Sequence, residues 1–449
     1  MNMLKVRLSA LNFLEFAVWG SYLVCLGLFL SNAGLGDYIY WFYTVQGLVS
    51  LFMPGLMGII ADRFIPAQKM LSLCHVLAGV FMFAAGWYAM DTLNAGEQIQ
   101  FAPLFTLYSL SVAFYMPTIG LNNSVAFNAL TKAGLDTVKA FPPIRALGTV
   151  GFIVAELIVN FVEIGGQTLQ NTYMQLFVCA LFSLIMAAYA LTMPKCEVNR
   201  NAGGSIADAL GLSAFKLFKD KQMAIFFIFS MLLGVSLQIT NSYGTPFINH
   251  FAAVEQYAHD FFALNPTFLI SLSQCSEAVC ILLIPFCLRK FGIKGVMLIA
   301  MLGWVLRFGL FGIGNTSPSG VWMLILSCII YGVAFDFFNV SGGIYVDKQT
   351  SPEMRSSAQG LFMIMTNGIG ASIGTLLAGS LVVNKYVYTP AIADNPMMQL
   401  EGWRMSWYIF AGYALIVAVL FMLIFHDNSA KKFEKELAEA EAHEKEALI

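Results

Sequence analysis

Residues 327–342 read SCIIYGVAFDFFNVSG, an apolar stretch with a single acidic side chain, Asp336, near its centre. The stretch lies in a longer apolar segment, residues 320–346, which is long enough to cross a bilayer as a helix. A carboxylate near the bilayer centre costs about 2.5–3.5 kcal/mol on translocon scales. Because such a residue usually faces a cavity, a partner or an ion path, Asp336 makes membrane transport the leading hypothesis.

The composition indicates a membrane protein along the whole chain. Of the 449 residues, 58% are hydrophobic and only 11% are charged, whereas soluble domains carry about 25% charged residues. Too few charges remain to solvate a soluble surface, so the composition predicts a polytopic α-helical protein in a lipid bilayer. The net charge of −2 carries no information about nucleic-acid binding. The sequence shows no basic patch with interleaved aromatic residues, so no nucleic-acid partner is expected.

Apolar segments of membrane-spanning length recur twelve times along the chain. They cover residues 8–30, 39–61, 70–90, 102–130, 141–162, 172–193, 223–249, 264–288, 295–314, 320–346, 357–383 and 404–425. We therefore expect an all-α membrane protein with twelve transmembrane helices in two six-helix bundles.

The longest polar interval separates the sixth segment from the seventh and defines the predicted domains. These are an N-terminal six-helix bundle at 1–193, a cytoplasmic linker at 194–222, a C-terminal six-helix bundle at 223–425 and a charged cytoplasmic tail at 426–449. The basic residues predict the orientation. With a cytoplasmic N-terminus, 20 of the 24 Lys and Arg residues fall on the inside, and only Lys385 and Arg404 lie in outside segments. The positive-inside rule therefore predicts that both termini are cytoplasmic.

Polar residues inside the fifth segment are the first candidates for a binding site. Arg145 follows the pair Pro142 and Pro143, which begins the helix, and Thr149 and Phe152 follow Arg145 by four and seven residues. This spacing places a cation, a hydroxyl group and an aromatic ring on one helix face. A role in a central cavity is favoured for Arg145, with snorkelling or structural pairing as the alternative.

The second half carries two pairs of polar residues, each on one helix face. Gln238 and Asn241 are three residues apart, as are Gln274 and Glu277. Amide side chains offer both donors and acceptors, although hydrogen bonding between helices is the alternative role for them. An acidic residue well inside a span, such as Glu277, indicates a functional position.

The segment around Asp336 adds aromatic groups. Tyr331, Phe335 and Asn339 recur every four residues on one face, and Asp336 lies about 100° around the helix from Phe335. Rings beside amides and carboxylates suit a ligand with a flat ring and several hydroxyl groups, because one part stacks and the other forms hydrogen bonds.

Four further ionisable residues lie in the apolar segments. We expect Glu15 to lie near the cytoplasmic end and reach water, and Glu156 to face the cavity or pair with another helix. Arg307 is expected to neutralise an acid or to snorkel, and His75 to be a satisfied packing residue rather than a proton carrier.

No enzyme or metal motif is recognisable. The sequence contains no HExxH, GxSxG, GxxxxGK[ST] or CxxC pattern, so no catalytic residue, cofactor or metal is expected. Secondary transport of a polar solute is the remaining function. A symporter for another polar solute such as a sugar is the nearest alternative, and a membrane enzyme or a receptor is a more distant one.

Two sets of residues resemble known families. After the second segment, Gly58, Asp62 and Arg63 occur in the order of the signature loop of major facilitator transporters, although Pro66 and Ala67 depart from it. We interpret Asp62 and Arg63 as a conformational clamp, with an ordinary charged loop as the alternative.

Over nearly its whole length the chain also resembles the bacterial nucleoside permeases of the nucleoside:proton symporter family. The resemblance is densest in FPPIRALGTVGF (141–152), MAIFFIFSMLLGVSLQITN (223–241), SLSQCSEAVCILLIPF (271–286), IIYGVAFDFFNVSGGIYVDK (329–348) and SSAQGLFMIMTNGIG (356–370).

This resemblance implies a major facilitator fold and a monomer of the bacterial inner membrane that imports nucleosides with protons by alternating access. One purine or pyrimidine nucleoside would bind in a central cavity, and Asp336 would carry the coupling proton, with Glu277 as a second candidate. The substrate would contact Arg145, Thr149, Phe152, Gln238, Asn241, Gln274, Glu277, Tyr331 and Phe335. Glu15 replaces a Gln of the related permeases, and Glu156 stands where the family resemblance implies an apolar residue.

Overall fold

The computed structural model describes residues 3–426 except 197, 199–211 and 351–353, and these residues are mostly helical. Helices suit a chain in lipid because every backbone N–H and C=O group inside a bilayer must be satisfied within the protein. The strands of the described part are β1 (Glu163–Ile164) and β2 (Gln167–Thr168), which form a short antiparallel hairpin. In its register Glu163 pairs with Thr168.

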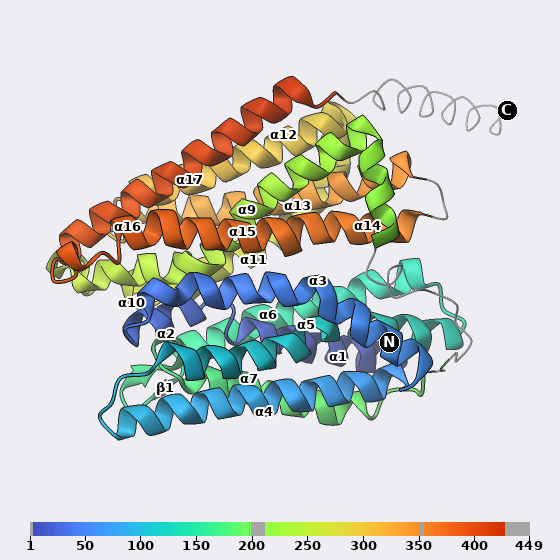
Figure 1. The fold of residues 1–449 in the computed structure, drawn as a ribbon, viewed down its shortest axis with the longest axis horizontal. Helices are drawn as coiled ribbons and strands as arrows, with labels where there is room; N and C mark the ends of the chain where they lie inside the picture. The colour runs from blue at the N-terminus through green and yellow to red at the C-terminus, as the bar shows by residue number, and fades with distance from the viewer. Residues whose placement is uncertain (1–2, 197, 199–211, 351–353, 427–449) are drawn as a thin grey trace.

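The N-terminal part of the chain forms one helical bundle, the lower of the two in Figure 1. Its principal helices are α1 (Met3–Gly20), α2 (Leu26–Asn32), α3 (Ile39–Arg63), α4 (Ala67–Asn94), α5 (Phe101–Lys132), α6 (Thr137–Phe161) and α7 (Met174–Ala190). Within it α1 packs on α6, and α4 packs on both α5 and α7.

The C-terminal part forms a second bundle that lies above the first in Figure 1. Its principal elements are η3 (Leu212–Lys219), α9 (Lys221–His250), α10 (Phe261–Leu264), α11 (Pro266–Cys280), α12 (Ile284–Ile313), α13 (Val321–Gln349), α14 (Arg355–Met363), the π-helix η7 (Ile364–Gly370), α15 (Ala371–Leu377), the π-helix η8 (Ala378–Val383), α16 (Asn384–Tyr386) and α17 (Pro396–Ile424). Here α12 packs on α13 and α17, and α11 packs on α13.

The prediction of twelve spans is confirmed. Nine helical stretches of the described residues are long and apolar enough to cross a membrane. One of them, Pro266–Ile313, is divided into two spans by Gly292, whose φ of 66° and ψ of 177° interrupt the helix. The helix α7 and the pair α1 and α2 supply the other spans. About half of the predicted linker and nearly all of the predicted tail lie outside the described residues.

The first span is not the continuous helix that its apolar pattern predicts, because it breaks between α1 and α2. Such a break leaves carbonyl groups that need donors from elsewhere in the protein. The Tyr43 hydroxyl donates to the Leu23 carbonyl at 2.6 Å, and the Thr245 hydroxyl donates to the Val24 carbonyl at 2.6 Å. Since Thr245 belongs to the other bundle, this break also ties the two halves together.

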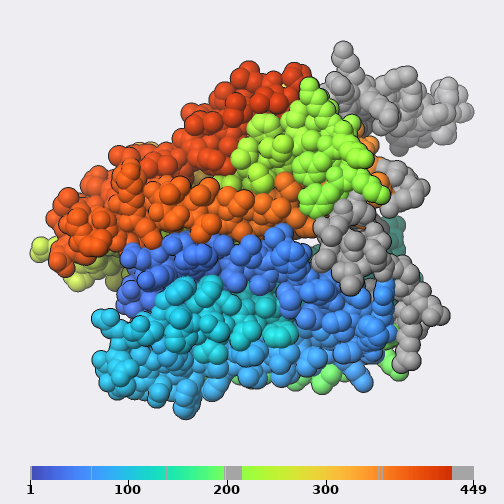
Figure 2. Space-filling model, in the orientation of Figure 1, coloured from blue at the N-terminus to red at the C-terminus, as the bar shows by residue number. Residues whose placement is uncertain are grey.

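The two halves meet along a seam, which Figure 2 shows on the face where α3 lies beside the helices of the second bundle. Across this seam α3 packs on α15 and η7, α6 packs on α11, and α2 packs on α9. Hydrogen bonds between the halves cluster at the end that carries the β1–β2 hairpin. They include the bond from Asn160 to Asn265 at 2.9 Å and the bond from Tyr388 to Ser31 at 3.2 Å. The halves are therefore joined at this end, opposite to the N-terminus (Figure 1).

Glycine sets the close approach of α1 and α6, and this contact gives a testable prediction. A Cβ atom at Gly151 would collide with the backbone carbonyl of Phe13, whereas one at Gly120 of α5 would meet nothing within 4 Å. We expect Gly151→Ala to lower stability by about 1–3 kcal/mol, as overpacking of a tight contact does. The melting temperature in detergent measures the effect, and Gly120→Ala serves as the matched control. Equal melting temperatures for the two variants would contradict this account of the contact.

Candidate functional site

Opposite charges face one another where the two halves meet. Arg145 lies on α6, Glu277 lies on α11, and these two helices pack together across the seam. The two side chains interact electrostatically but do not form a direct ion pair within 4 Å. Both are partly exposed rather than fully buried. The seam therefore holds a separated cation and anion, each with capacity for further polar contacts.

The guanidinium group of Arg145 rests on an aromatic platform that the sequence did not indicate. Its Cζ atom lies 3.9 Å from the centroid of the Phe16 ring, which is a cation–π arrangement. Behind it, Trp19 packs edge to face on Phe152, with 6.1 Å between ring centroids. Thr149 is half-buried on the same face of α6. Phe16 and Trp19 were missed because an aromatic residue in an apolar span carries no distinguishing local pattern.

The predicted amide residues are placed on α9 and α11. The Asn241 side chain donates to the Gln238 side-chain oxygen at 2.7 Å, which confirms that the two residues share a face. The Gln274 amide lies 2.9 Å and 3.2 Å from the Ile270 and Ser271 carbonyls, which accept its N–H groups. Each of these amides retains hydrogen-bonding capacity for a ligand, because an amide side chain offers two donors and an acceptor with two lone pairs, and the bonds to neighbours use only some of them.

The aromatic pair predicted on α13 is stacked. The rings of Tyr331 and Phe335 are nearly parallel, at 4°, with centroids 5.5 Å apart. Arg307 lies beneath them, with its Cζ atom 4.5 Å from the Tyr331 centroid. Arg307 neither snorkels nor forms an ion pair within the described chain, contrary to our expectation, because it is buried and donates to the Ser327 carbonyl at 2.9 Å and the Ser273 hydroxyl at 3.3 Å. The guanidinium group of Arg307 therefore forms a cation–π contact with the Tyr331 ring of the stacked pair.

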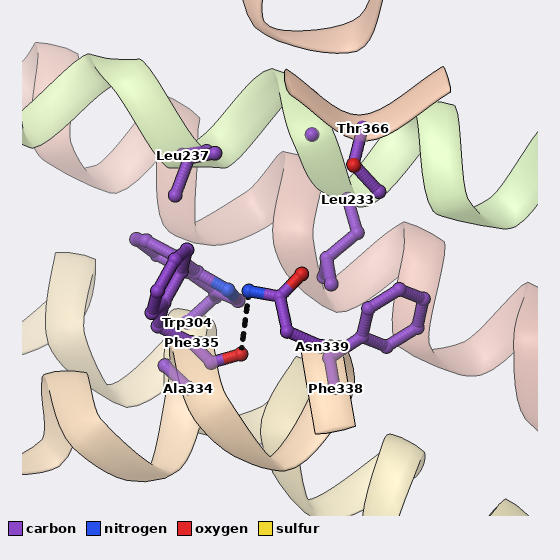
Figure 3. A pocket seen from close by; sticks show the side chains of 9 residues that line it. Leu233, Leu237, Trp304, Ala334, Phe335, Phe338, Asn339 and Thr366 are labelled. Carbon is purple, nitrogen blue, oxygen red and sulfur yellow. Dashed lines mark hydrogen bonds between the residues drawn. The ribbon is translucent and has the colours of Figure 1, made fainter. Parts of the chain in front are cut away.

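A small pocket opens beside this pair (Figure 3). Phe335 and Asn339 line it from α13, and Leu237 lines it from α9. In Figure 3 the Asn339 amide lies between these helices and donates to the Phe335 carbonyl at 3.1 Å. Trp304 forms another wall of the pocket, and its position within an apolar segment carried no signal that could have selected it. The cavity volume is about 10 Å³, far below the range of about 300–1,000 Å³ that is usual for a complete ligand site.

Asp336 is a buried carboxylate without full hydrogen bonding. Its side chain is 5% exposed, and its Oδ2 atom has no hydrogen-bond partner among the described residues. Asp336 interacts electrostatically with Glu277, so the acidic groups of α13 and α11 are neighbours. Removing the charge by protonation would lower the cost of burying this group and relieve the repulsion.

Glu15 differs from the sequence prediction, because it does not reach water. It is fully buried, and its carboxylate contacts His75 Nε2 at 2.9 Å and accepts a hydrogen bond from Thr118 at 2.6 Å. The other ring nitrogen of His75 lies 3.1 Å from the Ser183 hydroxyl. His75 is therefore satisfied at both nitrogens, in agreement with its expected packing role. Four helices of the N-terminal bundle are joined by this network.

The predicted clamp residues Asp62 and Arg63 are only partly described by the structure. Arg63 is half-buried at the end of α3, and the side chain of Asp62 lies outside the described part of the structure. The predicted clamp formed by these two residues therefore stays a prediction. Within the described chain, no group of three or more His, Cys, Asp or Glu side chains is arranged to hold a metal ion.

Comparison with known proteins gives a consistent result. A family model described as "Nucleoside H+ symporter" matches residues 1–430. The xanthosine permease of Escherichia coli (strain K12) is 43% identical to this chain, over 95% of this chain and 96% of that protein. The nucleoside permease NupG of the same organism is 41% identical, over 94% of this chain and 96% of the permease.

The fold is also similar to that of a solved structure. The crystal structure of the nucleoside transporter NupG superposes with a TM-score of 0.82 at 40% sequence identity. The superposition covers 95% of this chain and 100% of that chain. Similarity therefore extends through both halves of the molecule.

The buried contact between Glu15 and His75 generates a prediction about stability. His75→Leu removes one partner and leaves the Glu15 carboxylate buried without its neighbour, which costs roughly 3–5 kcal/mol when a buried pair is broken. We expect the double variant with Glu15→Gln to recover most of the melting temperature in detergent, because an amide at position 15 carries no charge. A double variant no more stable than His75→Leu would contradict the proposed pairing.

Proposed function

Because the chain belongs to the nucleoside H⁺ symporter family, whose members are transporters rather than enzymes, we propose that one nucleoside binds at the seam between its halves and that Asp336 carries the coupling proton. The family favours a nucleoside over the sugar considered as an alternative, and the fold is that of a major facilitator transporter. The observation that carries the proposal is the buried Asp336 carboxylate, with one oxygen lacking a partner beside the Tyr331 and Phe335 stack.

The proposed substrate site takes its parts from both halves. Arg145, Thr149 and Phe152 contribute from α6, and Gln238, Asn241, Gln274 and Glu277 contribute from α9 and α11. Tyr331 and Phe335 supply a ring surface on which a nucleobase stacks. The amides and the carboxylate are suited to ribose hydroxyl groups and to base edges, which both donate and accept hydrogen bonds. A ligand that contacts both halves would favour the movement that brings one half against the other.

Protonation of Asp336 supplies the coupling. When Asp336 is neutral, its repulsion with Glu277 is removed. Binding of a proton at Asp336 therefore favours binding of a nucleoside at the adjacent site, and binding of a nucleoside favours binding of the proton. One proton that moves down a membrane potential contributes about 2.3 kcal/mol per 100 mV. Because a factor of ten in concentration corresponds to about 1.4 kcal/mol, one proton at about 100 mV drives more than tenfold accumulation. Glu277 is the second candidate for this proton.

The proposed orientation places both termini in the cytoplasm of a bacterial inner membrane. The distribution of Lys and Arg supports this orientation. The hairpin end, where hydrogen bonds such as the one from Asn160 to Asn265 join the halves, is then periplasmic. The described conformation is therefore closed toward the periplasm, and alternating access requires these bonds to break when substrate is taken up. We assign this cycle to a single monomer, because both parts of the site belong to one chain.

The proton coupling is tested by uptake into proteoliposomes. Labelled uridine or adenosine should accumulate only with an inward proton gradient, and uptake indifferent to the gradient would instead indicate a uniporter. Asp336→Asn should abolish accumulation but retain exchange of labelled for unlabelled nucleoside, since the amide keeps the shape without the titrating group. Asp394→Asn, in an exposed loop, is the control. Accumulation that persists in Asp336→Asn would transfer the role to Glu277.

The proposed hydrogen bonds to substrate give a different pattern. Gln238→Ala or Asn241→Ala should raise the KM for uridine roughly two- to tenfold, because each lost hydrogen bond is worth about 0.5–1.5 kcal/mol. The dependence of accumulation on the proton gradient should remain. Gln98→Ala, in the exposed loop before α5, controls for the loss of an amide. A loss of coupling at unchanged KM would place these residues in the proton path instead.

A further inference from the structure

Glu156 is the most completely isolated acidic group in the membrane-spanning part of the described chain. It lies on α6, its side chain is fully buried, and neither carboxylate oxygen has a hydrogen-bond partner among the described residues. Burying an ionised carboxylate without a partner is far more costly than burying a neutral acid. The surroundings of Glu156 therefore suit a carboxyl group that carries a proton.

The position of Glu156 relates it to the substrate site. It follows Arg145 by eleven residues and Phe152 by four, so it continues the helix face that carries the proposed substrate contacts. One turn further, Asn160 donates to the Asn265 side chain at 2.9 Å and accepts a hydrogen bond from the Phe268 amide at 3.0 Å, both in the other half. Glu156 thus lies between the substrate contacts and the bonds that close the hairpin end.

The groups that face Glu156 offer it no positive charge. From α11 it meets Glu277, whose negative charge acts on it directly, and Cys275. Cys25 faces it from the turn between α1 and α2, and Tyr331 faces it from α13. Arg145 of its own helix lies three turns away and interacts with Glu277 instead. An ionised Glu156 would therefore be repelled by its charged neighbour and stabilised by none.

We propose that Glu156 is a second proton-binding site of the transport cycle, in addition to the site at Asp336. This inference rests on the proposed function, because it presupposes coupling to protons. When the hairpin end opens, water reaches Glu156 and its carboxylate takes up a proton. Closure buries the neutral acid as in the described conformation. The proton then passes to the Glu277 carboxylate, which is partly exposed at the seam, and from there to water on the opposite side. This transfer leaves Glu156 as a carboxylate, which water reaches when the hairpin end reopens for the next protonation.

The number of protons moved with each uridine molecule tests this proposal. Proteoliposomes are held at zero membrane potential with a pH difference of one unit, and the uridine concentration ratio that stops net flux is determined. Each coupled proton contributes a factor of about ten to this ratio, since a tenfold proton ratio and a tenfold solute ratio have equal free energy. Glu156→Gln should lower the balancing ratio about tenfold while uridine exchange persists. Glu163→Gln, in the exposed strand β1, should match the wild type.

The outcomes of this experiment distinguish a failure of the second proton site from a failure of the proposed function. An unchanged balancing ratio in Glu156→Gln would overturn the second proton site while leaving the proposed function intact. A wild-type ratio that ignores the pH difference would overturn the proposed function itself. Glu156→Leu provides a second neutral variant in case the amide is poorly accommodated. Loss of uridine exchange in both neutral variants would also overturn the proposal, because a site needed only for the proton is dispensable for exchange.

Discussion

An ionised side chain inside an apolar helical bundle must be paired, neutralised or supplied with water, and this constraint separates the structural charges of the protein from the functional ones. Glu15 is paired, since His75 and Thr118 contact both of its carboxylate oxygens. Arg307 donates to the Ser327 carbonyl and the Ser273 hydroxyl and lies against two aromatic rings, although its Nε atom has no hydrogen-bond partner among the described residues. Glu156 and Asp336 have carboxylate oxygens without a partner in the described chain. These two carboxylates lie on α6 and α13 and both interact with Glu277 at the seam.

The backbone obeys the same constraint. The break between α1 and α2 frees carbonyl groups that the hydroxyls of Tyr43 and Thr245 satisfy. A broken helix in lipid is tolerable only where other elements supply such donors. Because Thr245 comes from the C-terminal bundle, the Val24 carbonyl must find another donor whenever the halves separate at this end. Water that enters the opening gap is a suitable replacement, so hydration of the gap and separation of the halves are linked.

Sequence reasoning succeeded where the signal was local and strong. Twelve spans follow from segment length and polarity, and the shared face of Gln238 and Asn241 follows from their spacing, which the 2.7 Å hydrogen bond confirms. It failed where a contact joins distant positions. Glu15 meets His75 across 60 residues, and no local pattern predicts such a partner. Likewise the helix break after Gly20 and the π-helical turns after Met363 are decided by packing, because the apolar pattern continues through both.

The distribution of carboxylates over the two halves has a mechanical consequence. Glu156 belongs to the N-terminal bundle, whereas Glu277 and Asp336 belong to the C-terminal bundle. When Glu156 and Glu277 are ionised, their repulsion acts across the seam and opposes closure, whereas Arg145 attracts Glu277 across the same seam. A proton that binds to Glu156 removes the repulsion and leaves the attraction, while the apolar contacts of the seam stay the same. Closure at the hairpin end is therefore favoured by protonation. This gives the proton gradient a direct influence on the movement of the two halves, without a separate device to transmit it.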